Sequence, residues 1–205
     1  MMEATLDRLI GAVNTVSRYA AWVTGFLIML AAIIIGIDIT LRSVFVASLG
    51  FSNEFSSYSL AVASSWGCTV PLLSRSHVRI DSLYTHLPAR ARAFLDIVGL
   101  LSIIFFFGLV TQYAYYVFDQ SVVSNTHSVS TVEIPLAIPQ FIWFVGFVFF
   151  LFTAALLLIR AIVALIRNDT RLVHNLVGAR SAMEEIELEK ESLGVTPDPT
   201  KGGAA

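Results

Sequence analysis

The stretch YAAWVTGFLIMLAAIIIGIDITL, residues 19–41, contains one charged side chain, Asp38, near its end. The hydrocarbon core of a bilayer is about 30 Å thick, and a helix needs about 20 apolar residues to cross it. Lipid offers no partners to unpaired backbone groups, so a stretch of this kind crosses as a helix. Comparable apolar stretches follow at 55–73, 93–118 and 136–159. The sequence therefore predicts an all-α membrane protein with four transmembrane helices.

The overall composition agrees with a membrane protein. Of the 205 residues, 56% are hydrophobic and only 14% are charged, whereas about 25% of the residues of a soluble domain are charged. The net charge of −2 gives no argument for nucleic acid as a partner. The single cysteine, Cys68, excludes an intrachain disulfide and any multi-cysteine metal site.

The basic residues predict the orientation of the chain in the membrane. Twelve of the thirteen Lys and Arg residues precede the first stretch, lie between the second and third, or follow the fourth. Cytoplasmic segments carry the excess of basic residues, so both termini are expected in the cytoplasm of a multi-pass protein of the bacterial inner membrane. The thirteenth, Arg42, falls on the opposite side, where the 119–135 segment has no basic residue.

Four segments are expected along the chain. Residues 1–18 place apolar side chains near helical spacing and predict a short amphipathic helix in the membrane interface. Residues 19–167 form the four-helix transmembrane bundle, 168–194 a cytoplasmic helical extension, and 195–205 a disordered tail.

Few polar residues lie deep in the predicted spans. Asp38 and Arg42 are four residues apart, which suits either a structural pair on one helix or a contact with a partner. Small residues recur four apart at Ser59, Ala63 and Gly67, a pattern that allows close helix packing. That packing is either within the bundle or against a larger membrane subunit.

Basic residues flank the predicted cytoplasmic link between the second and third spans. These residues are candidate topology anchors and contacts for the headgroups of membrane lipids. They are Arg75, Arg79, Arg90 and Arg92. None of the four histidines falls within a predicted span, so axial haem ligands are not expected in the bundle.

The same link carries a motif, within PLLSRSHVRIDSLYTHLPARARAFLDIVGLL at residues 71–101. It resembles the small membrane subunit, DctQ type, of tripartite ATP-independent periplasmic (TRAP) transporters, in which a basic turn, H-[IV]-[RK]-[IV]-D, L-P and R-x-R follow one another. The acidic Glu54 before the second span and the basic Arg42 after the first also match that family. The motif positions are His77, Val78, Arg79, Ile80, Asp81 and Pro88.

The resemblance implies a scaffold rather than a catalyst. Such a subunit braces a large membrane subunit (DctM type) and helps to dock a periplasmic substrate-binding protein during sodium-coupled uptake of an organic acid. It implies no enzymatic activity, no cofactor, and no catalytic, metal or substrate site in this chain, with sodium bound in the large subunit. The alternative is a small membrane anchor or assembly subunit of a redox-chain complex.

Overall fold

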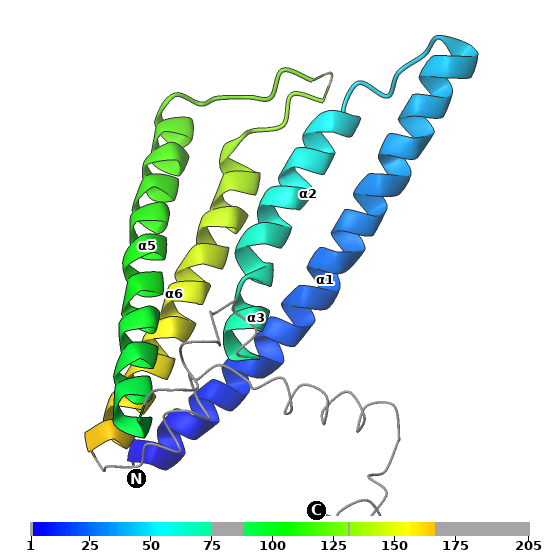
Figure 1. Cartoon of the computed structure of the whole chain (residues 1–205). Helices are drawn as coiled ribbons and strands as arrows, with labels where there is room; N and C mark the ends of the chain where they lie inside the picture. The colour runs from blue at the N-terminus through cyan, green and yellow to red at the C-terminus, as the bar shows by residue number, and fades with distance from the viewer. Residues whose placement is uncertain (1, 75–87, 131, 167–205) are drawn as a thin grey trace, which may run out of the picture.

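The computed structural model of the chain describes residues 2–74, 88–130 and 132–166 (Figure 1). The described part is built of helices joined by short loops. The five helices are α1 (Met2–Phe45), α2 (Ser52–Gly67), α3 (Thr69–Leu73), α5 (Ala89–Val123) and α6 (Ala137–Ile166).

Three of these helices are long and apolar enough to cross a membrane. They contain the apolar segments Thr5–Phe45, Ala91–Val123 and Ala137–Ile166, and they confirm the expected first, third and fourth spans as helices. At about 1.5 Å per residue, the 44-residue α1 is about 66 Å long, far more than the hydrocarbon core requires. All three helices therefore continue beyond the apolar stretches from which they were predicted.

The second expected span, 55–73, is a broken helix. α2 has 16 residues and ends at Gly67, and the five-residue α3 follows after Cys68. Pro71 explains the break, because it has no N–H to donate to the Gly67 carbonyl four residues earlier, and its ring collides with that carbonyl. The second of the four expected transmembrane spans thus remains a prediction, resting on α2 and α3 together.

A separate N-terminal helix over residues 1–18 is not observed, because α1 continues through Arg18 without interruption. The sequence there has no proline, and Ser17 donates its hydroxyl to the Asn14 carbonyl within the helix at 2.9 Å. Leu6 and Val13, two apolar residues of this segment, are buried against Leu156 of α6. The expected 168–194 helix and 195–205 tail lie outside the described residues.

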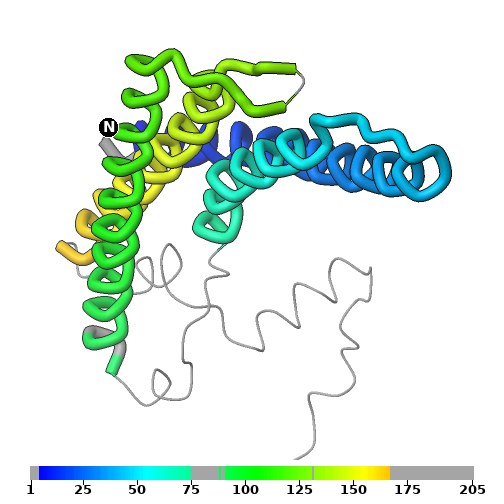
Figure 2. The backbone as a smooth tube through the Cα atoms, turned by 90° about the horizontal axis from the view of Figure 1, so that it is seen from above, coloured from blue at the N-terminus to red at the C-terminus, as the bar shows by residue number. Residues whose placement is uncertain are grey.

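The helices stand in a row rather than in a closed bundle. From left to right in Figure 1 the order is α5, α6, α2 and α1, and the view from above agrees (Figure 2). α1 packs against α2, α2 against α6, and α6 against α5, while the N-terminal part of α1 also reaches α6. In the most apolar 18-residue segment of α1, only 11% of the residues are buried, whereas the corresponding share for α6 is 39%. α6 is therefore the central helix and α1 an outer one.

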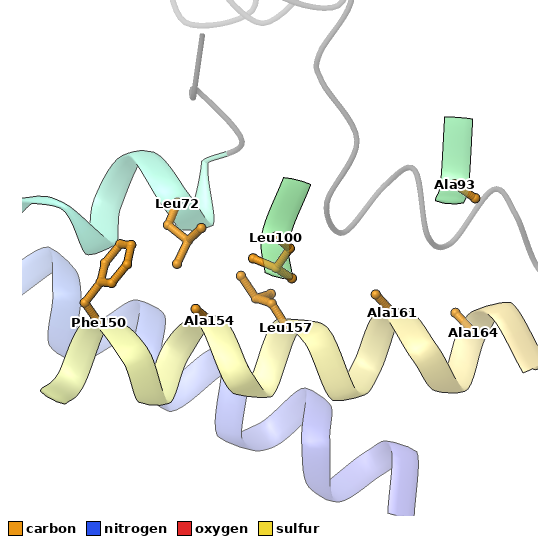
Figure 3. Close-up of a cluster of buried hydrophobic side chains, with 8 residues drawn as sticks. All are labelled: Leu72, Ala93, Leu100, Phe150, Ala154, Leu157, Ala161 and Ala164. Atoms are coloured by element: carbon orange, nitrogen blue, oxygen red, sulfur yellow. The ribbon is translucent and has the colours of Figure 1, made fainter. Parts of the chain in front are cut away.

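The main core lies along one seam of α6 (Figure 3). Its side chains recur at alternating intervals of four and three residues, which places them on one helix face. Three of the five seam residues of α6 are alanines, which let neighbouring helices come close. They pack against Leu72 of α3 and Ala93 and Leu100 of α5. The seam consists of Phe150, Ala154, Leu157, Ala161 and Ala164.

A second close contact joins α6 to α2 at Gly146. A Cβ at this glycine would lie 2.8 Å from Trp66 Cδ1 and 2.9 Å from Ser65 Cβ, both in α2. The Trp66 indole N–H donates to the Ile142 carbonyl at 3.0 Å, and its ring stacks on Phe149. Gly146 therefore allows α2 to pack directly on the backbone of α6.

Gly146→Ala should loosen this contact. Overpacking a tight site typically costs about 1–3 kcal/mol, so the variant should unfold at a lower temperature than the parent protein. The midpoint can be followed in detergent by the reaction of the Cys68 thiol with a maleimide dye during heating. Gly108→Ala in α5 is the matched control, because a Cβ there meets no atom within 4 Å. Equal midpoints for the two variants would contradict the close packing of α2 on α6.

Candidate functional site

Asp38 is the centre of a hydrogen-bond cluster at the end of α1. Its carboxylate is buried and accepts bonds from the Ser48 hydroxyl at 3.1 Å, the Leu49 N–H at 2.7 Å and the Ser52 hydroxyl at 2.8 Å. The Arg42 guanidinium completes the set at 2.7 Å, so the ion pair expected from their spacing is present. Four donors occupy the two carboxylate oxygens, so that Asp38 ties the end of α1 to the start of α2.

The turn between α1 and α2 is strained and depends on this cluster. Val46 has a φ of 53° and Gly50 a φ of 73°. A β-branched residue rarely adopts positive φ, and such a conformation persists only where its surroundings fix it. The bonds from Ser48 and Leu49 to Asp38 supply that constraint.

Glu54 makes a second connection at the same end of the row. It lies in the first turn of α2, just before the apolar 55–73 stretch, and accepts a hydrogen bond from the buried Ser128 hydroxyl of the α5–α6 loop. The Ser128 and Ser130 hydroxyls are 2.8 Å apart. Hydrogen bonds from Ser128 and then Ser130 hold the pKa of the Glu54 carboxyl below its ordinary value. Glu54 thereby joins the two halves of the row.

The α5–α6 loop is folded against this carboxylate. The Ser128 N–H donates to the Ile134 carbonyl at 2.9 Å, and the Leu136 N–H donates to the Thr126 carbonyl at 3.0 Å. These bonds close the loop into a hairpin-like turn that crosses the top of Figure 1 towards α2.

The folded loop presents apolar side chains outward. Val129 is fully exposed, and Val132 is 53% exposed. Ser128 and Ser130, on either side of Val129, are held towards Glu54, and the Val132 N–H donates to the Ser130 hydroxyl at 3.4 Å. We call Glu54, Val129 and Val132 the outer loop surface.

The positions of Arg18 and Asp38 indicate how α1 is placed across the membrane. Arg18 and Asp38 are twenty residues apart, which corresponds to about 30 Å along a helix and equals the thickness of the hydrocarbon core. Tyr19 and Trp22 are exposed beside Arg18, and aromatic residues of this kind gather at membrane boundaries. The Asp38 and Glu54 connections thus lie at one membrane boundary and Arg18 at the other.

The sequence analysis missed an ion pair at the Arg18 end. Arg160 Nε of α6 lies 2.9 Å from Asp7 Oδ1 of α1, and the Arg160 side chain is only 8% exposed. Arg160 had been counted only as a topology marker. The missed signal is its position in LLLIRAIVALI, residues 156–166, where apolar residues continue after it and require it to be paired.

The three small residues of α2 differ in how far they are buried within the chain. Ser59 is 4% exposed and therefore packed within the chain, while Ala63 and Gly67 are half-buried. A Cβ on Gly67 would meet no atom within 4 Å. Only the Ala63 and Gly67 positions remain open to another molecule.

Most of the family-like motif lies outside the described residues. That part holds Arg75 and Arg79 as well as His77, Val78, Ile80 and Asp81. Pro88 stands immediately before α5, and its carbonyl accepts from the Ala91 N–H at 2.9 Å and the Arg92 N–H at 3.1 Å. Arg90 and Arg92 both lie in the first turn of α5, and Arg92 is half-buried.

Asp38→Asn should destabilise the α1–α2 connection more than Arg42→Gln does. An amide offers one acceptor oxygen in place of two and turns an NH₂ towards existing donors. Removing the half-exposed Arg42 side chain leaves three donors on the carboxylate. The Cys68 thermal assay should therefore give the order parent, Arg42→Gln, Asp38→Asn, with Asp38→Asn several degrees below the parent. An inverted order would show that the exposed arginine, not the buried carboxylate, holds the turn.

Comparison with known proteins adds one finding. The family model for tripartite ATP-independent periplasmic transporters, DctQ component, matches residues 31–165. No curated protein and no solved structure matches the chain. The family match covers the Asp38 and Glu54 connections, the α5–α6 loop and nearly all of α6, and extends over more than half of the chain. The chain therefore belongs to the DctQ family, the small membrane components of tripartite ATP-independent periplasmic transporters.

Proposed function

We propose that this chain is the static scaffold subunit of a sodium-coupled TRAP transporter. It braces the large membrane subunit and helps the periplasmic substrate-binding protein to dock during uptake of an organic acid. Membership of the DctQ family establishes the transporter component, and the roles in bracing, docking and sodium-coupled uptake are the proposal. The redox-chain alternative gains no support from that family.

The open row of helices is the observation that carries the scaffold role. A closed bundle would bury its helices among themselves, but α1 exposes many large apolar side chains, and only 11% of its most apolar 18-residue window is buried within the chain. A row widens the membrane footprint of whatever protein it joins. Since helices associate in lipid by packing and not by the hydrophobic effect, the half-open Ala63 and Gly67 positions suit such contacts.

Most buried polar side chains in the described helices bond within the chain itself, whereas the Thr69 hydroxyl and the Gln140 amide oxygen are buried without a hydrogen-bond partner among the described residues. Thr24, Thr111 and Thr153 are buried, and each donates its hydroxyl to a carbonyl of its own helix, at 2.7–3.1 Å. Asp38 and Arg160 hold connections between helices. The proposal accordingly assigns the sodium and substrate sites to the large subunit.

The outer loop surface is the proposed docking contribution. It belongs to the end of the row that lacks the excess of basic residues, which faces the periplasm in the proposed orientation. α5 has 35 residues and is about 52 Å long, so it is longer than the hydrocarbon core and extends beyond it. An ordered surface with one carboxylate and two exposed valines suits a weak, reversible contact, in which charge sets the encounter rate and apolar contact the lifetime.

Cysteine labelling tests the orientation. In a Cys68→Ala background, Val129→Cys should react with a membrane-impermeant maleimide in cells whose outer membrane is permeabilised. Gly11→Cys, at an exposed position near the N-terminal end of α1, should react only after the inner membrane is opened. The reverse pattern would invert the proposed topology and remove the outer loop surface from the periplasm.

Uptake into proteoliposomes tests docking. Val129→Asp should raise the concentration of binding protein needed for half-maximal uptake by about tenfold, since a buried valine contributes about 1.5 kcal/mol or more. Glu54→Gln should act in the same direction by weakening the loop. The matched control is Val46→Asp, which adds the same charge at another exposed valine.

The sodium titration of the same samples separates scaffold from transport chemistry. Each variant should keep the sodium dependence and substrate preference of the parent transporter when its complex content is equal. A fully assembled variant with a shifted sodium dependence would place part of the transport chemistry in this chain and refute the scaffold proposal.

A further inference from the structure

A groove follows the half of α1 that begins at Arg18. It runs from Arg18 to Met29, is bordered by Val70 of α3, and has a volume of about 510 Å³. Trp22 and Phe26 stand in its wall, and they are 79% and 58% exposed. The space over Gly25 is open, because a Cβ on this residue would meet no atom within 4 Å.

A smaller recess adjoins the groove at its charged end. Its volume is about 180 Å³, and Thr15, Arg18, Tyr19 and Trp22 line it. Arg18 and Trp22 line both spaces. One continuous depression therefore has a polar, cationic end and an apolar remainder.

The length of the groove matches one leaflet of a bilayer. Arg18 and Met29 are eleven residues apart, or about 16 Å along the helix, and half of the hydrocarbon core is about 15 Å. Arg18 sits at the membrane boundary, with Tyr19 and Trp22 exposed beside it as amphipathic aromatic residues at headgroup level.

We propose that the groove and recess bind an anionic phospholipid. Its phosphate contacts the Arg18 guanidinium, whose planar donor fork matches phosphate geometry. One acyl chain lies along Gly25 between Trp22 and Phe26. In the proposed orientation this lipid belongs to the cytoplasmic leaflet.

A transmembrane helix of another protein fits the groove less well. Close helix packing needs small residues at the contact. Ala21 and Gly25 lie four residues apart in the groove, but Trp22 and Phe26 beside them stand in its wall and obstruct the approach of another helix. A helix covering Arg18 would also have to neutralise a charge for which the described part of the chain provides no ion pair. A phospholipid supplies that negative charge and a flexible chain together.

Native mass spectrometry of the full chain, purified in detergent and stripped of lipid, tests the proposal. The probes are palmitoyl-oleoyl phosphatidylglycerol and phosphatidylcholine in equal amounts, which share acyl chains and differ in charge. The parent chain should retain phosphatidylglycerol preferentially. Arg18→Gln should lower its retention about fivefold and leave phosphatidylcholine unchanged, since one basic contact to an anionic lipid surface is of that strength. Gly25→Leu should fill the groove and lower retention of both lipids.

Two substitutions on the same helix serve as matched controls. Arg8→Gln removes an exposed arginine outside the groove, and Gly36→Leu fills open space outside it. Both should retain lipid like the parent. An unchanged phosphatidylglycerol preference in Arg18→Gln, or unchanged lipid retention in Gly25→Leu, overturns the proposal. If Gly25→Leu keeps its lipid but loses a co-purifying membrane protein, the groove is a helix contact instead.

Discussion

Lipid supplies no hydrogen-bond partner, so each polar group that enters the membrane must be satisfied by the protein. Within the helices the chain meets this requirement mostly locally, as when Thr153 donates its hydroxyl to the Phe149 carbonyl one turn earlier. The Thr69 hydroxyl and the Gln140 amide oxygen are the exceptions among the described buried side chains. At the ends of the helices it uses longer contacts, from Asp38 to the following turn and from Arg160 back to Asp7. The polar groups are therefore also the places where the helices are joined, and their positions determine how the row is held.

Because lipid is itself apolar, it also weakens the hydrophobic effect, which drives helices to assemble in water. Apolar side chains gain little by leaving lipid for a protein interior, so association depends on close packing. α6 provides it on several sides: Gly146 towards α2, the alanine seam towards α3 and α5, and Leu156 towards the start of α1. α1 lacks such a surface along most of its length. It is held mainly by α2, together with Asp38 at one end and Asp7 at the other, which is why the helices form a row.

Local features of the sequence were sufficient for part of this architecture. The length of the apolar runs predicted four spans, of which three are confirmed as helices long enough to cross a membrane, and a spacing of four residues predicted the Asp38–Arg42 pair. The break at Gly67 was also local, since Pro71 follows it by four residues, but the span was read as continuous. Non-local contacts were not predictable in this way. Asp7 and Arg160 are 153 residues apart, and counting basic residues gives the sidedness of a charge without its partner. The bond from Ser128 to Glu54 likewise joins the α5–α6 loop to the first turn of α2, which the pattern of spans leaves unconnected.

The exposed surface of α1 divides into two parts with different physical requirements. From Arg18 to Met29 it is a groove with a cation at its mouth, which suits a molecule with a charged head and a flexible chain. Beyond Met29 the exposed Ala32 and Gly36 leave the backbone accessible, and a Cβ on Gly36 meets no atom within 4 Å. A rigid helix needs that access, whereas an acyl chain does not. The proposed lipid binding near Arg18 and the proposed bracing of a larger subunit near Gly36 therefore do not compete. A lipid in the groove would also cover Trp22 and Phe26, leaving the outer half of α1 as the part of this helix available to a protein partner.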